Sequence, residues 1–538
     1  PPRATLFPYT TLFRSRDNHN APYDEPVLNV ISCTYIGKVF GGGYGERAVL
    51  HGNPTVNINM IAGRWASELG AADKLGEIVD VFGGGNAAKV EGNTTVNIGT
   101  ATKVGMVTEP TYLETSAYEE NATTGLYEVT TQGANITGNV YGGGNLADVT
   151  GITQVNICAK EVTSGTTTSW QSVTPGTAGV AIAGNVYGGG KGVASESGAR
   201  AFFCEEAMVG INDTNSATNN DAPAYADYGT HVRIGNGTIG NGTTGGNVYG
   251  GGEIGRVEFH TEVVIGLGEG TEGAAKSPVI NGSVFGAGKG TNTHGYSGLV
   301  RGDSRVTIQG DAKVGHSVYG GGEMASIGKY ELDANGLPKT PKFGGKCTVT
   351  IQGYAEIGPD NMQMTKEGGP DDTGHVFGAG KGTLPYENVT GTPWSMELTG
   401  KVNYDEGKES DYYKFIQSLG LASNSDVTIG EHAFVKGSVY GGSENGYLQA
   451  NTHVTIAGGQ VGAGYDKEQN KSLPKYAETA FIDPSNSETP VTESNALATC
   501  ATWTYDKTTT GNPYDKYAGT AGYDAKGGAT ASGPGCCR

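Results

Sequence analysis

The chain is poor in long apolar side chains and in positive charge. Only 36% of its 538 residues are hydrophobic and 8% are aromatic, and it has 36 Lys and Arg against 55 Asp and Glu. The resulting net charge of −19 repels phosphate backbones and anionic lipid surfaces, so we expect no nucleic-acid partner. No run approaches the ~18 apolar residues of a membrane-spanning helix, so we expect no membrane span.

Cysteine and histidine are sparse and irregularly spaced. The seven cysteines include no C-x-x-C pair, and an odd number at irregular spacing does not make a disulfide framework. The nine histidines lack the spacing of metal ligands, and the G-G-x-G-x-D pattern of calcium-binding β-rolls is missing. We therefore expect no metal site and no cofactor.

Glycine, by contrast, is abundant, with 91 residues, and much of it belongs to one phrase. This glycine phrase, Val followed by Phe or Tyr and a glycine cluster, occurs nine times. Its copies begin at Val39, Val81, Val140, Val186, Val248, Val284, Val318, Val376 and Val439. Such repeats predict a solenoid, in which each unit packs on its neighbours. We expect these valines, with the aromatic residues, to form the core.

The fourth residue after each aromatic alternates in charge from the fourth copy onward. This charged column consists of Lys191, Glu253, Lys289, Glu323, Lys381 and Glu444. Neighbouring strands lie about 4.8 Å apart, where like charges repel and opposite charges pair. We therefore interpret the charged column as a structural ladder of ion pairs between successive rungs.

A second phrase, Val-x-Ile, also occurs nine times, from Val56-Asn57-Ile58 to Val454-Thr455-Ile456. Residues i and i+2 of a strand share a face, so the Val and Ile point inward and the middle residue points outward. A lone Ile or Val before each glycine phrase indicates a third strand. Three short strands per repeat predict an all-β fold, a parallel β-helix of about nine rungs with irregular insertions.

The repeats divide the chain into four parts. Residues 33–464 form the predicted solenoid, 16–32 a lead-in, and 465–538 a polar, low-complexity tail that is disordered or a long insertion. Thr5–Ser15 reads like one frame of a sequencing adapter, so we interpret residues 1–15 as an artefact and the chain as a metagenomic fragment. Insertions between strands of a solenoid form loops along its edges, often at the binding edge.

No set of residues in the sequence predicts catalysis. Asp371 with Asp372 and Glu205 with Glu206 are adjacent pairs, which face opposite ways on a strand. Glycoside hydrolysis needs two carboxyl groups that converge at about 5–9 Å. We therefore assign no catalytic residue and expect these carboxylates to be solvated. The tripeptide Arg301-Gly302-Asp303, an integrin-binding motif elsewhere, aligns with the turn before Val-x-Ile in other repeats.

The Val-Tyr-Gly-Gly-Gly and Val-Asn-Ile phrases, with Gly138-Asn139 leading into Val140, resemble large repetitive surface proteins of gut Bacteroidota. The resemblance covers residues 33–464. It implies a secreted or cell-surface protein with an adhesin-like role.

Our leading hypothesis is a non-enzymatic protein, extracellular or on the bacterial cell surface, that binds glycan or a host ligand through loops inserted in the solenoid. One alternative is a polysaccharide-acting β-helix enzyme, a lyase or a hydrolase. Three or more charged residues from different rungs, converging in one groove, would favour it. Another alternative is a purely structural stalk, which featureless insertions would favour.

Overall fold

The structure is a computed structural model that describes residues 25–463 with internal gaps. The gaps are residues 63–73, 111–117, 194–206, 212–228, 243–244, 269, 271–276, 293–294, 331–338, 340, 342–343, 360–372, 384–416 and 431. Outside these parts the structure describes six short strands: β30 (Ser395–Met396), β31 (Val402–Asn403), β39 (Tyr465–Asp466), β40 (Lys471–Ser472), β41 (Phe481–Asp483) and β42 (Asn486–Val491). The predictions for residues 1–15 and for most of the 465–538 tail lie outside the described residues.

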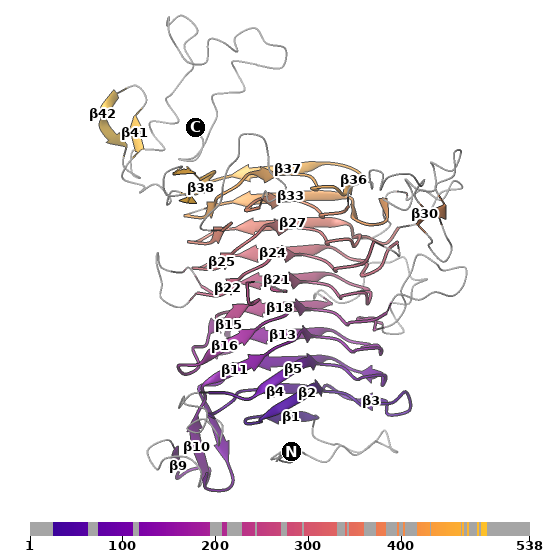
Figure 1. Ribbon diagram of the computed structural model, residues 1–538, viewed down its shortest axis with the longest axis vertical. Coiled ribbons are helices and arrows are strands. Elements are labelled where there is room, and N and C mark those ends of the chain that lie inside the picture. The colour runs from indigo at the N-terminus through magenta and orange to yellow at the C-terminus, as the bar shows by residue number, and fades with distance from the viewer. Residues whose placement is uncertain are drawn as a thin grey trace, which may run out of the picture.

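One face of the molecule is a ten-stranded parallel sheet built from the Val-x-Ile phrase. Its strands, in order, are β1 (Val27–Val30), β4 (Thr55–Ile58), β7 (Thr94–Ile98), β13 (Thr153–Ile157), β18 (Thr230–Ile234), β21 (Thr261–Ile265), β24 (Ser304–Ile308), β27 (Lys346–Ile351), β33 (Asn424–Ile429) and β37 (Thr452–Ile456). Each Val and Ile pairs with its equivalent in the next strand, as Val232 does with Val263. The strands are stacked along the long axis of the molecule (Figure 1).

The sheet has one strand more than the nine Val-x-Ile phrases predict. The additional strand, β1, reads Val-Leu-Asn-Val and pairs in register with β4, Asn29 with Asn57 and Val30 with Ile58. Leu28 takes the place of the valine and Val30 that of the isoleucine, which removes the phrase from the sequence while keeping apolar residues at both inward positions. The parallel stack therefore begins inside the segment that the sequence marks only as a lead-in.

The other two faces come from the lone Ile or Val and from the glycine phrase. In the first two rungs a single strand covers both, β2 (Tyr35–Phe40) and β5 (Glu77–Phe82). Later rungs use separate strands: β11 (Gly133–Ile136), β12 (Val140–Tyr141), β16 (Gly179–Ile182), β17 (Val186–Tyr187), β19 (Thr238–Ile239), β20 (Val248–Tyr249), β22 (Val279–Ile280), β23 (Val284–Phe285), β25 (Lys313–Val314), β26 (Val318–Tyr319), β28 (Glu356–Ile357), β29 (Val376–Phe377), β34 (Phe434–Val435), β35 (Val439–Tyr440) and β38 (Gln460–Val461). All of their pairings are parallel, so the predicted parallel β-solenoid is confirmed.

The main core lies between these three faces. It contains the Val and Ile of the Val-x-Ile phrase, the lone Ile or Val, and the valine of the glycine phrase. Eight of the nine phrase valines, from Val39 to Val376, are buried there, and Val439 in the last rung is partly buried against it.

The aromatic residues do not join this core. They form a separate stack from Phe40 through Phe82 to Phe377 and Tyr440, with ring centroids 4.7–5.0 Å apart and rings within 13° of parallel. Successive residues of a strand face opposite sides, so the ring beside an inward valine must point away from the main core. The aromatic residues are therefore buried, as expected, but in a cluster of their own beside the main core.

A second, smaller core escapes the sequence pattern. One residue per rung forms a parallel bridge with the next, in the order Val90, Val149, Val209, Val257, Val300 and Ile327. They pack with Leu50 of β3 (Leu50–His51), Ala422 of β32 (Leu421–Ala422) and Leu448 of β36 (Tyr447–Leu448), while Val90 begins β6 (Val90–Glu91). A single valine per rung has no local periodicity, so this fourth column is visible only in the structure.

Hydroxyl groups join the corners to the ten-stranded sheet. The buried Thr230 donates a hydrogen bond to the carbonyl of Gly250 at 2.6 Å, and Thr261 does the same to Gly286 at 2.5 Å. Equivalent bonds recur at Thr94, Thr153 and Ser304. Each satisfies a buried carbonyl that would otherwise cost roughly 1–3 kcal/mol.

Two projections from the rungs are described. A hairpin follows β13 and consists of β14 (Ala159–Ser164) and β15 (Thr167–Ser172). A three-stranded sheet consists of β8 (Lys103–Met106), β9 (Tyr118–Asn121) and β10 (Leu126–Thr130).

In the described part of the chain, no helix is both long and apolar enough to span a membrane.

Candidate functional site

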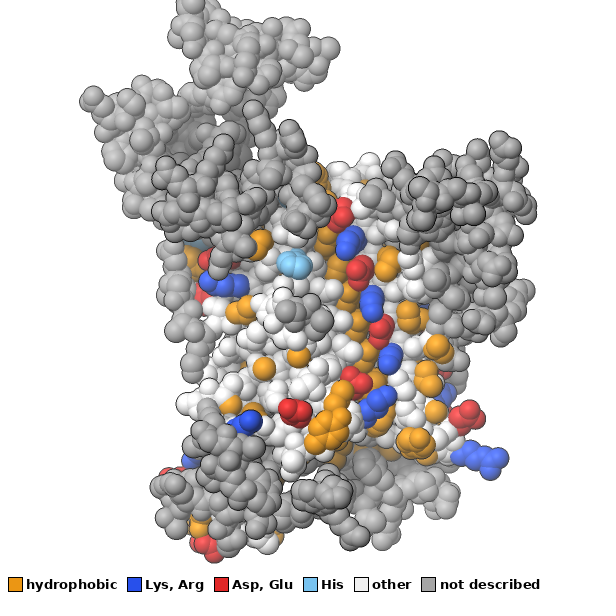
Figure 2. Space-filling view, viewed as in Figure 1, with side chains coloured by type: hydrophobic (Ala, Val, Ile, Leu, Met, Phe, Trp, Pro, Cys, Tyr) orange, Lys and Arg blue, Asp and Glu red, His pale blue; other side chains and the backbone are white. Residues whose placement is uncertain are grey.

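The charged column lies along one line of the molecule. The backbone N–H of each of its residues donates to a glycine of the preceding rung, as Glu253 does to Gly190 and Lys289 to Gly252, both at 3.0 Å. The line of alternating red and blue side chains is visible in Figure 2. Its six residues therefore occupy equivalent places on successive rungs.

Ion pairs in the charged column join each of two lysines to the glutamate of the rung before it. Lys289 Nζ lies 3.0 Å from Glu253 Oε1, and Lys381 Nζ lies 3.7 Å from Glu323 Oε1. Lys191 follows Asn145 in the column, so its preceding rung offers an amide rather than a carboxylate. The pairs are partly exposed, and each adds a modest amount of stability.

The glutamates of the column also accept hydrogen bonds from the aromatic stack, which the sequence analysis missed. Tyr141 Oη donates to Glu253 Oε2 at 2.6 Å, and Tyr249 Oη donates to Glu323 Oε2 at 2.6 Å. Tyr319 donates to Glu444 in the same way. Each bond skips one rung.

This skip explains a second alternation in the sequence. Glycine phrases that end in Glu253, Glu323 or Glu444 have Tyr after the valine, whereas those that end in Lys289 or Lys381 have Phe there. A tyrosine hydroxyl can donate to the charged column only where a glutamate lies two rungs later. Two rungs after Phe285 the residue of the column is Lys381, which cannot accept a hydrogen bond. Two tyrosines depart from this rule. The Tyr187 hydroxyl accepts a bond from Asn185 Nδ2 at 3.2 Å, and no glycine phrase is described two rungs beyond Tyr440.

Burial sets the ionisation of these phenols. It raises the pKa of Tyr141 far above the usual range for tyrosine, and the negative charge of Glu253 raises it further. Burial, followed by the bond to Glu444, raises the pKa of Tyr319 in the same sense. Both phenols therefore remain protonated donors at any physiological pH, as a structural bond requires.

We expect Lys289→Glu to lower the free energy of unfolding by about 1–2 kcal/mol at low salt, because it removes one ion pair and places three acids in succession. Urea denaturation should show the loss, and high salt should reduce it. Lys191→Met is the matched control, with a change of about 0.5 kcal/mol or less. An unchanged Lys289→Glu variant at low salt would contradict side-chain contact between the rungs.

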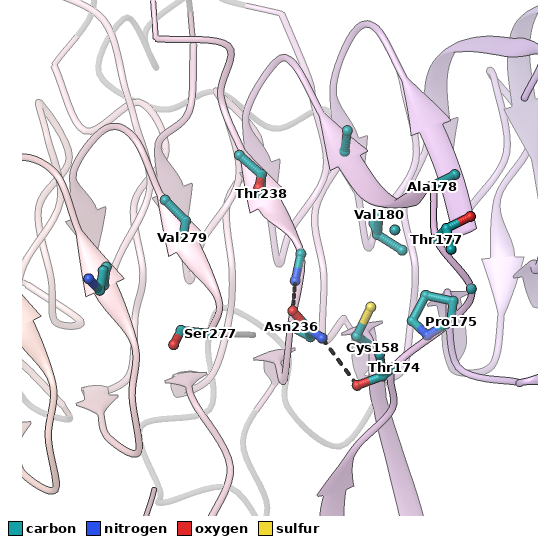
Figure 3. A pocket seen from close by; sticks show the side chains of 15 residues that line it. Cys158, Thr174, Pro175, Thr177, Ala178, Val180, Asn236, Thr238, Ser277 and Val279 are labelled. Carbon is teal, nitrogen blue, oxygen red and sulfur yellow. Dashed lines mark hydrogen bonds between the residues drawn. The ribbon is translucent and has the colours of Figure 1, made fainter. Parts of the chain in front are cut away.

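A separate feature is a cleft at the base of the β14–β15 hairpin. After β15 the chain returns across residues 174–178 to β16, and this return forms one wall of a cleft of about 680 Å³. Figure 3 shows the side chains that line it. They come from the hairpin base and from three later rungs.

The floor of the cleft consists of outward positions on successive strands. Ala181 pairs with Thr238, Thr238 with Val279, and Val279 with Lys313, and all four line the cleft. Parallel strands repeat at about 4.8 Å. The floor of the cleft thus offers a polar or apolar contact at regular intervals.

The walls carry hydroxyl and amide groups. Asn236 Nδ2 donates to Thr174 Oγ1 at 3.4 Å, and the N–H of Gly237 donates to Asn236 Oδ1 at 2.7 Å, which fixes the orientation of the amide (Figure 3). Thr177 and Ser277 add further hydroxyls. Such groups match the hydroxyls of sugars, which both donate and accept hydrogen bonds.

Charge is sparse in the cleft. Among the described residues that line it, Lys313 is charged at neutral pH, and its Nζ lies 3.9 Å from Glu356 Oε1. Burial raises the pKa of the Cys158 thiol to about 12, so this lining residue remains a thiol and a poor nucleophile. The arrangement can hold a polar ligand, and no lining carboxylate is described that could act as acid or base.

A partly buried ionic cluster fixes the hairpin to the ten-stranded sheet. The guanidinium carbon of Arg233 lies 4.3 Å from the centre of the Trp170 ring on β15. Glu262 Oε2 lies 2.9 Å from His231 Nδ1 and 3.5 Å from Arg233 Nη2. His231 and Arg233 lie at outward positions of β18, and Glu262 lies at one of β21. The sequence marks these two strands only by the middle residue of Val-x-Ile, which is Arg or Val here and Asn or Thr in the other copies.

The cluster predicts a pH dependence. Burial alone would raise the pKa of Glu262, but its bond with His231 and the charges of His231 and Arg233 lower it below the usual value. A carboxyl group whose pKa is lower in the folded than in the unfolded state stabilises the fold at pH values above its unfolded-state pKa of about 4.3. That stabilisation is lost as the pH falls through the pKa of the folded state. In Glu262→Gln we expect the free energy of unfolding, measured by urea denaturation, to fall less steeply with pH below about pH 4.5. Glu120→Gln, at an exposed position, should leave this pH dependence unchanged.

The Arg-Gly-Asp tripeptide lies in a corner of the solenoid. Arg301 Nη1 is 2.7 Å from Glu258 Oε2, and the N–H of Lys346 donates to Asp303 Oδ1 at 2.9 Å. A Cβ added to Gly302 would lie 2.4 Å from the carbonyl carbon of Phe259. These contacts give the tripeptide a structural role in the stack.

Asp371, Asp372, Glu205 and Glu206 lie outside the described residues, and so do the longest predicted insertions. Within the described part, no group of three or more His, Cys, Asp and Glu side chains is placed to hold a metal ion.

Compared with known proteins, the chain matches no family model, no curated protein and no solved structure. Its class is therefore defined by its fold, a parallel β-solenoid with projecting segments.

Proposed function

We propose that this chain is a non-enzymatic, adhesin-like repeat protein of the extracellular space or the bacterial cell surface, and that it binds glycan. The cleft at the base of the β14–β15 hairpin carries this proposal. It joins an inserted segment to a regular floor of outward residues, and it is lined by hydroxyl, amide and small apolar groups.

The surroundings of the cleft favour binding over catalysis. The two glutamates with the least exposed side chains in the ion pairs of the described chain are engaged elsewhere, Glu258 with Arg256 and Arg301, and Glu262 with His231. A glycosidase or lyase needs charged groups that converge on a bound chain. Among the described lining residues, Lys313 is the charged group, and a single lysine cannot supply both the acid and the base of a polysaccharide-cleaving mechanism.

The repeated phrases and the acidic composition support a surface location. Their likeness to repetitive surface proteins of gut Bacteroidota is the basis for proposing that source and an adhesin-like role. A cell-surface protein in such a habitat meets host mucins and plant polysaccharides, so these glycans are the first ligands to test.

Binding of the full chain to a broad array of mucin and plant glycans tests the proposal. We expect selective binding without release of shorter sugars, and loss of that binding in Thr238→Trp, which fills the cleft floor. Thr350→Trp, at an outward position of the ten-stranded sheet, is the matched control and should bind normally. Release of shorter sugars would favour the enzyme, and no binding at all would favour a structural stalk.

A further inference from the structure

The charged column is open to solvent on one face of the molecule. The side chains of Lys289 and Lys381 are 34% and 40% exposed, and those of Glu253 and Glu323 are 19% and 18% exposed. Figure 2 shows the line of charges uncovered, with apolar side chains beside it. A partner can therefore reach the column without a rearrangement of the described rungs.

The column is evenly spaced and close to straight. The aromatic rings beside it lie 4.7–5.0 Å apart from Tyr187 to Tyr440, and successive ring planes turn by 5–10°. Two such columns placed face to face have the same spacing. Their charged groups therefore stay opposite one another over six rungs.

The order of charges in the column is complementary to itself. A column that alternates Lys, Glu, Lys, Glu, Lys, Glu has the opposite sign at every place when it is reversed. An antiparallel second copy that faces the first would therefore set opposite charges against each other at every rung: Lys191 with Glu444, Glu253 with Lys381, and Lys289 with Glu323. A parallel copy at the same level would set every charge against its like, which is unfavourable.

The ion pairs within one column leave room for these contacts. Glu253 and Glu323 each contact one lysine and one tyrosine in the described structure. A carboxylate has about four acceptor sites, and an ammonium group has three donors. Bonds between two columns would thus add to the bonds within each column.

An alternation of size follows the alternation of charge. The residues directly after the charged column are Gly192, Ile254, Gly290, Met324, Gly382 and Asn445. They occupy equivalent places, because the N–H of Ile254 donates to the carbonyl of Lys191 at 2.8 Å and that of Met324 donates to Lys289 at 2.7 Å. The glycines are buried, whereas Ile254 and Met324 are partly exposed. The surface therefore has a recess at each Lys rung and an apolar projection at the Glu253 and Glu323 rungs.

This relief also fits itself in the antiparallel arrangement. The two-fold axis runs across the column, so the same side of the column meets in both copies. Met324 then faces Gly290 of the second copy, and Ile254 faces Gly382 of the second copy. Projections meet recesses in the same register in which opposite charges meet.

We propose that two copies of this chain associate face to face and antiparallel through the charged column, on a two-fold axis that passes between the levels of Lys289 and Glu323. The contact is isologous, because both copies use the same surface, so it closes at a dimer. The charges fix direction and register, and the apolar side chains in the glycine recesses supply a packed contact. The inference stands apart from glycan binding, because no residue that lines the cleft belongs to the column.

A charge exchange between two variants tests the contact in the full chain. In Lys289→Glu alone, and in Glu323→Lys alone, the two-fold axis sets like charges against each other twice. In an equimolar mixture, the introduced glutamate of one variant faces the introduced lysine of the other, and the unaltered Lys289 and Glu323 face each other. Each variant disturbs its own column equally, alone or mixed, so mixing isolates the contact between copies.

Sedimentation velocity over a wide range of protein concentration gives the readout, and circular dichroism checks that each variant keeps the β-sheet spectrum. We expect the unaltered chain to form dimers, each variant alone to associate at least about tenfold more weakly, and the mixture to recover most of the affinity. High salt should weaken the unaltered dimer.

Glu323→Lys also removes the bond that Tyr249 donates. If that variant does not fold, Lys191→Glu and Glu444→Lys make the same exchange at the two ends of the column. Three results would overturn the proposal: an unaltered chain that stays monomeric, assemblies that grow beyond the dimer, or a mixture of folded variants that associates no better than its components.

Discussion

Replacing Tyr249 by Ala is expected to lower the free energy of unfolding by about 3–5 kcal/mol. Tyr249 is fully buried, and its ring lies between those of Tyr187 at 4.8 Å and Phe285 at 5.0 Å. Neighbouring rings are fixed to the backbone of their own rungs, so they cannot close the cavity that the substitution leaves. The stack would be broken in its middle.

Tyr249→Phe separates the ring from its hydroxyl group. It keeps both stacking contacts and removes the hydroxyl with its two hydrogen bonds, the one donated to Glu323 and the one accepted from Asn247 Nδ2 at 3.0 Å, so we expect a loss of roughly 1.5–3 kcal/mol, typical of a bond to a charged group. Urea denaturation followed by circular dichroism measures both variants. If Tyr249→Ala were no more harmful than Tyr249→Phe, the ring would not be packed in a continuous stack.

Gly250→Ala is expected to cost about 3 kcal/mol or more, because the new methyl group has no space. Its Cβ would lie 2.2 Å from the carbonyl oxygen of Gly286 in the next rung and 3.1 Å from Thr261 Cβ. The oxygen belongs to a backbone that is itself hydrogen bonded to a further rung, so it cannot yield. The first glycine of the phrase is glycine in all nine copies, as this contact requires.

Gly442→Ala is the matched control, and thermal unfolding should show almost no change. Gly442 follows that first glycine in the last copy, and a Cβ there would meet nothing within 4 Å. Alanine already occupies this second place at Ala287 and Ala379. Equal losses from Gly250→Ala and Gly442→Ala would indicate a general effect of alanine in the phrase and would contradict close stacking of the corners.

The sequence predicts those parts of the fold that repeat with a local period. Alternation in Val-x-Ile identifies the inward residues of nine strands, and the alternating charges place their glycine phrases on adjacent rungs. β1 is missed because Leu28 and Val30 stand where the phrase has Val and Ile. The fourth column, from Val90 to Ile327, is missed because one residue per rung has no neighbour in the sequence that marks it.

The contacts that cross rungs are harder to predict than the rungs. The bond from Tyr141 to Glu253 skips a rung, so its partners are far apart in the chain, and only the paired alternation of Tyr with Glu and Phe with Lys could have indicated it. The cleft was not predicted at all. Its walls depend on how the chain returns from β15 to β16, and that path follows from hairpin packing through Trp170 rather than from any repeat.

An engineered disulfide tests the in-register stacking of the rungs, on which the whole account depends, most directly. Thr307 of β24 and Thr350 of β27 are partners at outward positions, so their Cα atoms lie within the range of about 4.4–6.8 Å that a disulfide spans. Thr428 is one rung further, about 9.6 Å from Thr307, beyond that range. After mild oxidation, peptide mapping should find the 307–350 bond in Thr307→Cys with Thr350→Cys and no bond in Thr307→Cys with Thr428→Cys. A bond in the second variant, or none in the first, would contradict the parallel, in-register solenoid.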